Sequence, residues 1–489
     1  GGGGSNVTSF NYNIGTETAT IGTDQPGVFN AIFPIQHRQV LEVRKDGDDA
    51  SAIASTVAPY SVQNAFLTFE AAWAAAEPDD IIWVRPGSYT PAITSSWTTT
   101  SGPKAVYCDP GVIFNSSAAT IVQFEEEGEF YWGGAATFEV VADCFVNNAE
   151  HFNFTLEANK ALSVAGSQLA SMQNSDFKIR INEMIDVGFD LKGWVRTKIA
   201  VDYWESKNWL FFTSSPDGSN FDLHGQAQIY ISGRSSDKAF IRRNNASTAG
   251  ILLGAGAYNA RNLNVEIHAN WLWMDGYAVD HQGGILTLIG TIIPQKSGEA
   301  GNELPFYSCT TTSPGSQDYK PVFTHIGKMV MGGRLFNNTM VDIRQAGTFK
   351  FDGEYKSSGQ DEQGLLTPFP CISVSNLDVD GQTNVTFNGV FATGRAADVG
   401  PIRITEIGNP NNELRIQFLD VLAVCENTEK SVAPIYGTII TAPPLALFPY
   451  HSLGMTRPWD TTYFSNALSV DRTYYDTSIS FSIPEYEGP

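Results

Sequence analysis

The chain has 489 residues, and its 30 Lys and Arg against 52 Asp and Glu give a formal net charge of −22 at pH 7. Only 17% of the residues are charged and 42% are hydrophobic, which excludes a disordered chain and a membrane-inserted protein. Nucleic acid requires a basic stripe, and this acidic chain has few runs of Lys or Arg to form one. We therefore expect no nucleic-acid partner and no insertion into a membrane.

The five cysteines lie far apart and form no CxxC or CxxH pair, which argues against a zinc site or a redox motif. An odd number of cysteines also rules out a complete disulfide framework. We predict buried free thiols at Cys108, Cys144, Cys309, Cys371 and Cys425. The first residues, GGGGSNVTSF, lack the basic and apolar regions of a signal peptide, so we expect no secretory leader.

In chain order, composition predicts four parts. Residues 1–40 are rich in Thr, Asn and Gly and predict an N-terminal arm. Residues 41–105 predict the start of a solenoid with a capping helix, and residues 106–435 predict the solenoid itself. Residues 436–489 begin with a Pro- and aromatic-rich stretch and predict a C-terminal cap or an oligomerisation segment, because a solenoid needs both ends closed.

The capping helix is predicted between a turn and a short strand. The turn is Asp46-Gly47-Asp48-Asp49, and Ser61 is an N-cap candidate for the helix that follows. Apolar residues recur at steps of three and four, at Phe66, Phe69, Trp73 and Ala76. Pro78 ends the helix, and residues 81–84 form an apolar strand closed by Pro86-Gly87.

Beyond residue 105 the sequence alternates in short stretches that are typical of strands, separated by Asn, Gly, Ser and Asp. The clearest of these stretches are 177–191, 226–233, 262–270, 284–293, 339–355, 384–394 and 414–425. Their spacing suits coils of about 20–25 residues, so we predict an all-β fold, a parallel β-helix. A β-sandwich or a propeller is the alternative.

The segment from Asp46 to Tyr89 resembles the N-terminal cap of the right-handed parallel β-helix proteins of the pectate-lyase-like superfamily. The matching residues are Asp46-Gly47, Pro59-Tyr60, the helix through Glu77, Pro78-Asp79-Asp80 and Pro86-Gly87-Ser88-Tyr89. Asp79 stands where the family usually has Gly. The resemblance covers about 50 residues and implies the fold, but says little about chemistry.

In its general layout the chain also resembles phage tailspike and receptor-binding proteins. An arm precedes a helix-capped β-helix, the chain is acidic and has few cysteines, and an aromatic, polar tail follows. The resemblance implies a homotrimer in a virion, in contact with other virion proteins and with a bacterial surface glycan or receptor. Secretion is the alternative location.

Two groups of residues are candidates for a site. In residues 349–356, strand alternation places Asp352 and Glu354 on one outer face, at a separation that suits a general acid and base across a glycosidic bond. The alternative is a solvated face on which Lys350 and Lys356 balance the two acids.

The second group is the stretch from Glu266 to Trp273. Alternation turns Glu266 and His268 outward, and Trp271 and Trp273 are either core residues or platforms for sugar rings. We take Glu266, His268, Trp271 and Trp273 as candidate substrate-binding residues.

These observations favour a virion spike that recognises a bacterial surface polysaccharide or receptor. A polysaccharide depolymerase, either hydrolase or lyase, and a non-catalytic adhesin are the alternatives, and the sequence leaves open whether the chain is an enzyme. We expect no cofactor and no bound metal, although a lyase of the resembled superfamily would use calcium.

Overall fold

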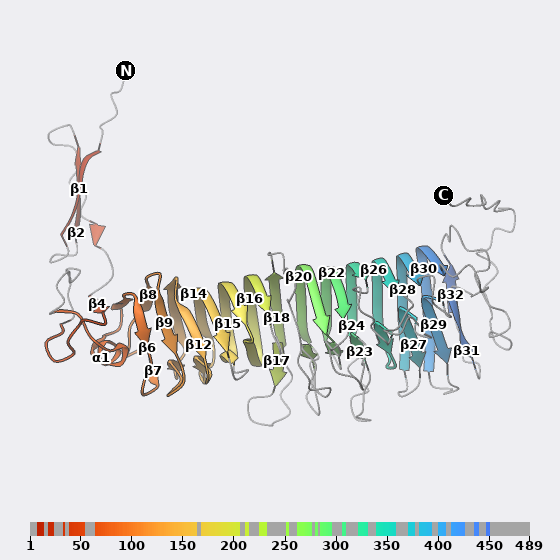
Figure 1. The fold of residues 1–489 in the computed structure, drawn as a ribbon, viewed down its shortest axis with the longest axis horizontal. Helices are drawn as coiled ribbons and strands as arrows, with labels where there is room; N and C mark the ends of the chain where they lie inside the picture. The colour runs from red at the N-terminus through yellow and green to blue at the C-terminus, as the bar shows by residue number, and fades with distance from the viewer. Residues whose placement is uncertain are drawn as a thin grey trace, which may run out of the picture. The chain divides into compact units, whose positions relative to one another are not determined.

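The structure is a computed structural model. It describes residues 7–13, 18–23, 33–34, 39–53, 64–163, 168–205, 211–214, 224–231, 251–253, 262–275, 279–281, 284–295, 306–309, 321–330, 339–357, 370–376, 381–393, 400–406, 412–425, 435–439 and 446–449. The chain divides into two compact units, residues 1–182 and residues 183–489, and each is described by itself. Figure 1 shows strands stacked one beside the next within each unit.

Within the predicted N-terminal arm, three strands form a small antiparallel sheet of their own. Strand β1 (Val7–Asn13) pairs with β2 (Thr18–Thr23), and β2 pairs with β3 (Phe33–Pro34). This antiparallel sheet sets the arm apart from the parallel strands that follow.

The rest of the first unit winds in coils whose strands form three parallel ladders. The first ladder runs through β4 (Val40–Val43), β5 (Ile81–Val84), β8 (Ala105–Cys108), β11 (Gly128–Gly134) and β14 (Phe152–Ser163). The second runs through β6 (Gly87–Tyr89), β9 (Val112–Asn115), β12 (Thr137–Val140) and the end of β14. The third runs through β7 (Ser95–Trp97), β10 (Val122–Phe124), β13 (Phe145–Asn147) and β15 (Gln168–Ile185). This arrangement confirms the predicted parallel β-helix.

The interior of the first unit is aromatic, and the helix α1 (Phe69–Ala75) covers one end of it. Phe69 packs edge-on against Phe114, with ring centroids 5.1 Å apart, and also contacts Trp132. Trp73 contacts Phe130, with centroids 5.8 Å apart. The helix therefore closes the apolar core at the first coil, as predicted, because the first rung has no preceding coil to cover it.

The helix begins later than the sequence suggested. Its N-cap is Thr68, whose hydroxyl accepts a hydrogen bond from the Ala71 amide at 3.3 Å. Asp49 fixes this start, because its carboxylate accepts bonds from the amides of Leu67 and Thr68 and from the Thr68 hydroxyl. Phe66 forms a β-bridge with Val43 instead of a helical turn. The predicted cap, Ser61, lies outside the described residues.

The described strands of the second unit form two parallel ladders, one of long strands and one of short strands. The long strands are β16 (Gly188–Glu205), β18 (His224–Ile231), β20 (Asn262–Asp275), β22 (Ile285–Gln295), β24 (Val322–Val330), β26 (Gly347–Ser357), β28 (Gly381–Thr393), β30 (Asn412–Cys425) and, at the end, the shorter β32 (Ala446–Pro449). The short strands are β17 (Phe211–Ser214), β19 (Ile251–Leu253), β21 (Val279–His281), β23 (Tyr307–Cys309), β25 (Val341–Ile343), β27 (Ile372–Asn376), β29 (Ile402–Glu406) and β31 (Ile435–Ile439). The ladders continue to Pro449, and residues 450–489 of the predicted cap lie outside the described part.

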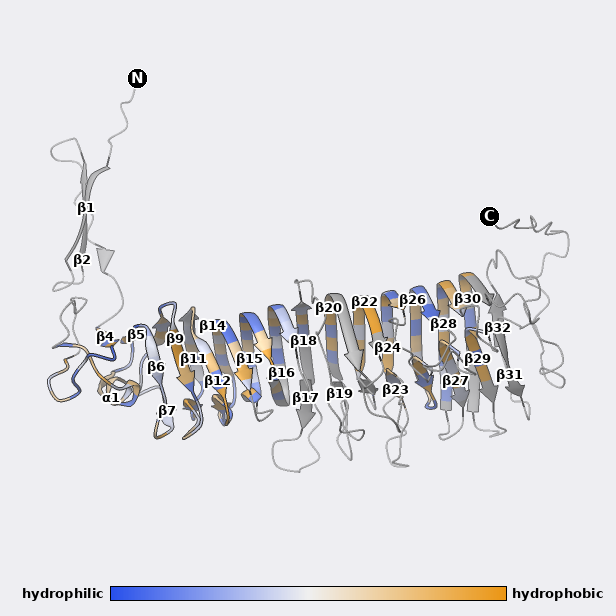
Figure 2. Ribbon diagram, in the orientation of Figure 1, coloured by the Kyte–Doolittle hydropathy of each residue, from blue (hydrophilic) through white to orange (hydrophobic). Residues whose placement is uncertain are grey.

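Coil length differs between the two units. In the first unit, Ile81 pairs with Ala105 and Phe130 with Phe154, each 24 residues later, as predicted. In the second unit, Val265 pairs with Leu286 after 21 residues, but Leu286 pairs with Phe323 only after 37. The extra residues fall between the strands, so the parallel register survives although the period varies. Figure 2 shows hydrophobic and hydrophilic residues alternating along the strands.

A column of glycines lies inside the long strands of the second unit. Gly290, Gly327, Gly353 and Gly389 have φ angles between 105° and 147° and pair with one another from rung to rung. A Cβ on Gly327 would lie 2.1 Å from the carbonyl oxygen of Gly290, and a Cβ on Gly353 would lie 1.7 Å from that of Gly327. Only glycine fits a position that combines positive φ with so close a backbone approach. The column therefore marks a shared bend.

Two histidine–tyrosine pairs are buried inside the second unit. His281 Nε2 lies 3.1 Å from the Gly284 carbonyl and Nδ1 lies 2.8 Å from the Tyr307 hydroxyl. His325 Nδ1 lies 2.6 Å from the Tyr355 hydroxyl. Burial lowers the pKa of His325 to about 4, against smaller opposing effects of the Gly290 backbone and the Asp352 charge. His325 is therefore neutral inside the folded chain at pH 7.

The cysteine prediction is confirmed where side chains are described. Cys108, Cys144, Cys309 and Cys371 are buried free thiols. Burial raises the pKa of Cys144 and of Cys371 to about 12, so both remain protonated thiols. The side chain of Cys425 lies outside the described part.

We predict that replacing two glycines at corners of the first unit by alanine destabilises the chain by different amounts. One replacement causes backbone strain alone, and the other also causes a steric clash. In the first unit, Gly134 (φ 102°) would place a Cβ 2.1 Å from the Cys108 carbonyl oxygen, whereas Gly111 (φ 91°) would meet only Pro86 Cβ at 3.5 Å. Gly111→Ala should lower the free energy of unfolding by about 1–3 kcal/mol through strain. Gly134→Ala should lower it by about 1–3 kcal/mol more through overpacking. Denaturant unfolding of both variants measures the difference, and equal losses would contradict the stacked-corner geometry.

We also predict a stability loss in acid that depends on His325. An unfolded histidine has a pKa near 6.5 and the folded His325 has a pKa of about 4, so between these values only the unfolded chain binds the proton. The free energy of unfolding should therefore fall as pH falls through this window, by about 3 kcal/mol in all. Denaturant unfolding at several pH values should show this loss reduced in His325→Gln. His151→Asn, at an exposed position with φ 54° that Asn tolerates, should retain it. An unchanged slope in His325→Gln would contradict the assignment.

Candidate functional site

Parallel register aligns one outward-facing polar residue from every long strand of the second unit, from β16 to β30. Each residue pairs directly with the one on the next rung, and all are half-buried or exposed. We call this set the polar row; it comprises Lys198, Gln228, Glu266, Thr287, Thr324, Lys350, Thr386 and Gln417. The row is nearly continuous in hydrogen-bonding groups, with adjacent members about 4.8 Å apart along the solenoid.

A second outward row lies two residues further along the same strands. We call it the mixed row, and it comprises Tyr230, His268, Ile289, Ile326, Asp352 and Asn388. Ile326 is 40% exposed, so this row combines apolar and polar contacts at the surface. The sequence-predicted residues Glu266, His268 and Asp352 therefore share one face, although up to 86 residues separate them along the chain.

The two rows meet at the predicted pair Glu266 and His268. His268 Nε2 bonds to the Glu266 carboxylate, and both side chains are about one third exposed, at 34% and 28%. The His268 ring stacks on Tyr230, with centroids 4.9 Å apart and planes inclined by 13°. Lys198 Nζ lies 5.3 Å from the Tyr230 ring centroid. The stacked faces of Tyr230 and His268 therefore cover each other.

Asp352 and Glu354 lie on either side of the glycine column. The predicted alternation of this strand is confirmed, because Phe349, Phe351 and Tyr355 are buried while the acids are partly exposed. Asp352 accepts a hydrogen bond from Asn388 Nδ2 at 2.8 Å and lies 3.4 Å from Lys350 Nζ. Glu354 lies 2.7 Å from Lys328 Nζ. Each acid therefore has a lysine of its own, and the pairing for catalysis stays a prediction.

Other predicted features fall partly outside the described residues. Trp271 and Trp273 lie in β20, but their side chains are not among those described. In the described part, no group of three or more His, Cys, Asp and Glu is arranged to hold a metal ion. No helix in that part is long and apolar enough to span a membrane.

Sequence reasoning missed Tyr230 and the threonines of the polar row. The alternation of each strand is visible in the sequence and correctly turns these residues outward. The missing information is the register, since unequal connections of 21 and 37 residues separate neighbouring rungs. Without the register, Thr287 and Thr324 have no visible relation to Glu266.

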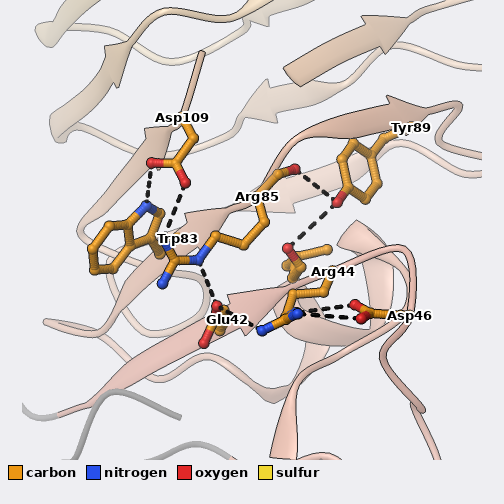
Figure 3. Close-up of polar contacts among 8 residues, drawn as sticks. Glu42, Arg44, Asp46, Trp83, Arg85, Tyr89 and Asp109 are labelled. Atoms are coloured by element: carbon orange, nitrogen blue, oxygen red, sulfur yellow. Dashed lines mark hydrogen bonds and ion pairs between the residues drawn. The ribbon is translucent and has the colours of Figure 1, made fainter. Parts of the chain in front are cut away.

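A charged network at the first coils forms a second polar cluster (Figure 3). Glu42 is buried, and its carboxylate accepts a hydrogen bond from Arg85 Nε. Arg85 Nη1 donates to Asp109 Oδ2 at 3.0 Å, and Arg44 pairs with Asp46. Because a buried carboxylate without a partner is costly, Arg85 stabilises Glu42 and links three successive rungs.

Comparisons with protein-family models, with curated proteins and with solved structures found no match for this chain. The resemblance of the N-terminal segment to the pectate-lyase-like superfamily therefore stays a prediction at the level of family. The fold itself, a parallel β-helix solenoid, rests on the pairing of the strands.

Proposed function

We propose that this chain binds a bacterial surface polysaccharide along the polar row of its second unit, as the receptor-binding part of a virion spike. The polar row carries this proposal. A polysaccharide repeats its hydroxyl groups along its length, and the row repeats amide, hydroxyl, ammonium and carboxylate groups from rung to rung. A rigid parallel ladder holds these groups in fixed register, so little conformational entropy is lost on binding.

The mixed row supports the same proposal. Glycan binding requires apolar contacts for the C–H faces of sugars beside hydrogen-bonding groups for their hydroxyls. Ile289 and Ile326 supply the apolar contacts, next to Thr287 and Thr324. The Tyr230–His268 stack supplies hydrogen-bonding edges at one end of the row.

Cleavage of the polysaccharide is the second candidate, because Asp352 lies on the same face as the polar row. A hydrolase needs two carboxyl groups that face one bond, at separations of about 5–10 Å. Here each acid is paired with a lysine, which favours binding over cleavage. The homotrimeric virion setting comes from the resemblance of the layout and belongs to the proposal.

The test is retardation of the full chain in gels that contain bacterial surface polysaccharides, one polysaccharide in each gel. The triple variant Gln228→Ala, Thr287→Ala, Thr324→Ala removes three neighbouring groups of the polar row and should weaken the binding at least tenfold. The three side chains are half-buried and face outward, so their replacement by Ala should leave the variant folded. The matched control is Ser373→Ala with Arg403→Ala, outward residues of the other ladder, and it should bind as the unmodified chain does.

The same samples distinguish binding from cleavage. We expect no release of reducing ends or of unsaturated products from the retained polysaccharide. If such products are released, and if their release is lost in Asp352→Asn or Glu354→Gln, the chain cleaves the polysaccharide and the proposal of binding alone is wrong. Equal retardation of the triple variant and the unmodified chain, or no retardation by any polysaccharide, would contradict the proposal.

A further inference from the structure

Tyr107 stands out on the surface of the first unit. It is 41% exposed, and it is the most exposed of the Phe, Tyr and Trp side chains among the described residues. It points outward from β8, in register with Trp83 on the preceding rung and with Gly133 on the following rung. An exposed aromatic side chain that is placed this way leaves a ring surface available to a ligand.

Trp83 is held rigidly beside Tyr107. Its indole Nε1 donates to Asp109 Oδ1 at 2.9 Å, and the Arg85 guanidinium lies 4.0 Å from the ring centroid (Figure 3). Asp109 also accepts from Arg85, and Arg85 donates to the buried Glu42. The charged network at the first coils therefore fixes the orientation of this ring before any ligand arrives.

Tyr131 continues the line of rings on the next rung. Its ring lies over Gly133, where an added Cβ would meet Cε1 of Tyr131 at 2.4 Å and its hydroxyl oxygen at 2.5 Å. The rings of Tyr107 and Tyr131 lie 5.3 Å apart and are inclined by 50°. The Tyr131 hydroxyl donates to Glu157 at 3.1 Å, and burial raises the pKa of Tyr131 to about 12, so this donor persists at neutral pH. The bare backbone of Gly133 thus makes room for the ring.

We propose that Trp83, Tyr107 and Tyr131 form an aromatic strip that binds a glycan chain without acidic groups, at a site in the first unit separate from the polar row. The rings offer apolar surface to the C–H faces of sugar rings. Asp109 at one end and Glu157 at the other offer carboxylate oxygens to sugar hydroxyl groups.

The charge of the side chains around the aromatic strip determines which class of glycan can bind there. Arg85 is already paired with Glu42 and Asp109, while Glu157 accepts a hydrogen bond from Tyr131 and the exposed Glu129 lies two residues before Tyr131 on the same strand. A uronate or a phosphate-bearing glycan would meet this negative charge, on a chain whose formal net charge is −22. A neutral glycan meets no such repulsion. This inference deepens the proposed function, on which it rests for the choice of a glycan as ligand.

The experiment is titration calorimetry of the full chain with neutral oligosaccharides of glucose, mannose, galactose and N-acetylglucosamine, and with oligogalacturonate as the acidic probe. At least one neutral oligosaccharide should bind, and oligogalacturonate should not bind at this strip. Tyr107→Ala should weaken the neutral binding at least tenfold, and Tyr107→Phe should retain it, because the ring face carries the contact. Gly133→Ala should also weaken it, because the new methyl group displaces the Tyr131 ring.

Two readouts separate glycan binding by this strip from a purely structural role of its rings. The thermal midpoint of Tyr107→Ala should stay close to that of the unmodified chain; a large drop in midpoint with unchanged binding would assign the rings to structure alone and overturn the inference. Equal affinity for the neutral oligosaccharide in the unmodified chain, Tyr107→Ala and Gly133→Ala would also overturn the inference.

The polar-row triple variant makes failure of the two proposals distinguishable. If that variant loses polysaccharide retardation while Tyr107→Ala retains neutral binding, the polar row stands and the strip fails. If Tyr107→Ala and Gly133→Ala lose neutral binding while the triple variant behaves as the unmodified chain, the strip stands and the polar row fails.

Discussion

Each coil of this protein hydrogen-bonds to the preceding coil in parallel and in register, and every other feature depends on that pairing. Parallel register places the same kind of position on successive rungs one above the other. Phe351 and Phe387 are direct partners on β26 and β28, and for this reason their buried rings stack with centroids 5.7 Å apart. The outward residues between them form rows by the same rule. Parallel register therefore orders both the buried rings of the core and the polar side chains of the surface.

The register has a steric cost where the strands bend. At the glycine column each carbonyl oxygen occupies the space that the next rung would need for a Cβ, so the bend and the stacking are compatible only with glycine. At the two ends of the column, Ala269 and Val421 replace glycine, and the register there is interrupted by a bulge. The strands therefore pass this bend in one of two ways: with a glycine at the bend, or with a bulge beside a larger residue.

The sequence predicted what local patterns encode. The alternation around Phe349 and Phe351, the burial of the cysteines, and the capping helix with Phe69 and Trp73 facing the core all follow from short-range periodicity. The start of the helix did not, because Asp49 reaches across 19 residues to fix Thr68 as the cap. The polar row and the aromatic strip were also invisible, because they depend on register across connections of unequal length.

The register itself is the central claim, and engineered cysteines test it directly. Thr287 and Thr324 are direct partners on adjacent strands, about 4.8 Å apart, which a disulfide can bridge. Thr287 and Lys350 are two rungs apart, at about twice that distance, which a disulfide cannot bridge. Mild oxidation should cross-link Thr287→Cys with Thr324→Cys and leave Thr287→Cys with Lys350→Cys reduced, as measured by peptide mapping. Cross-linking of the second pair and not the first would contradict the register and, with it, both rows.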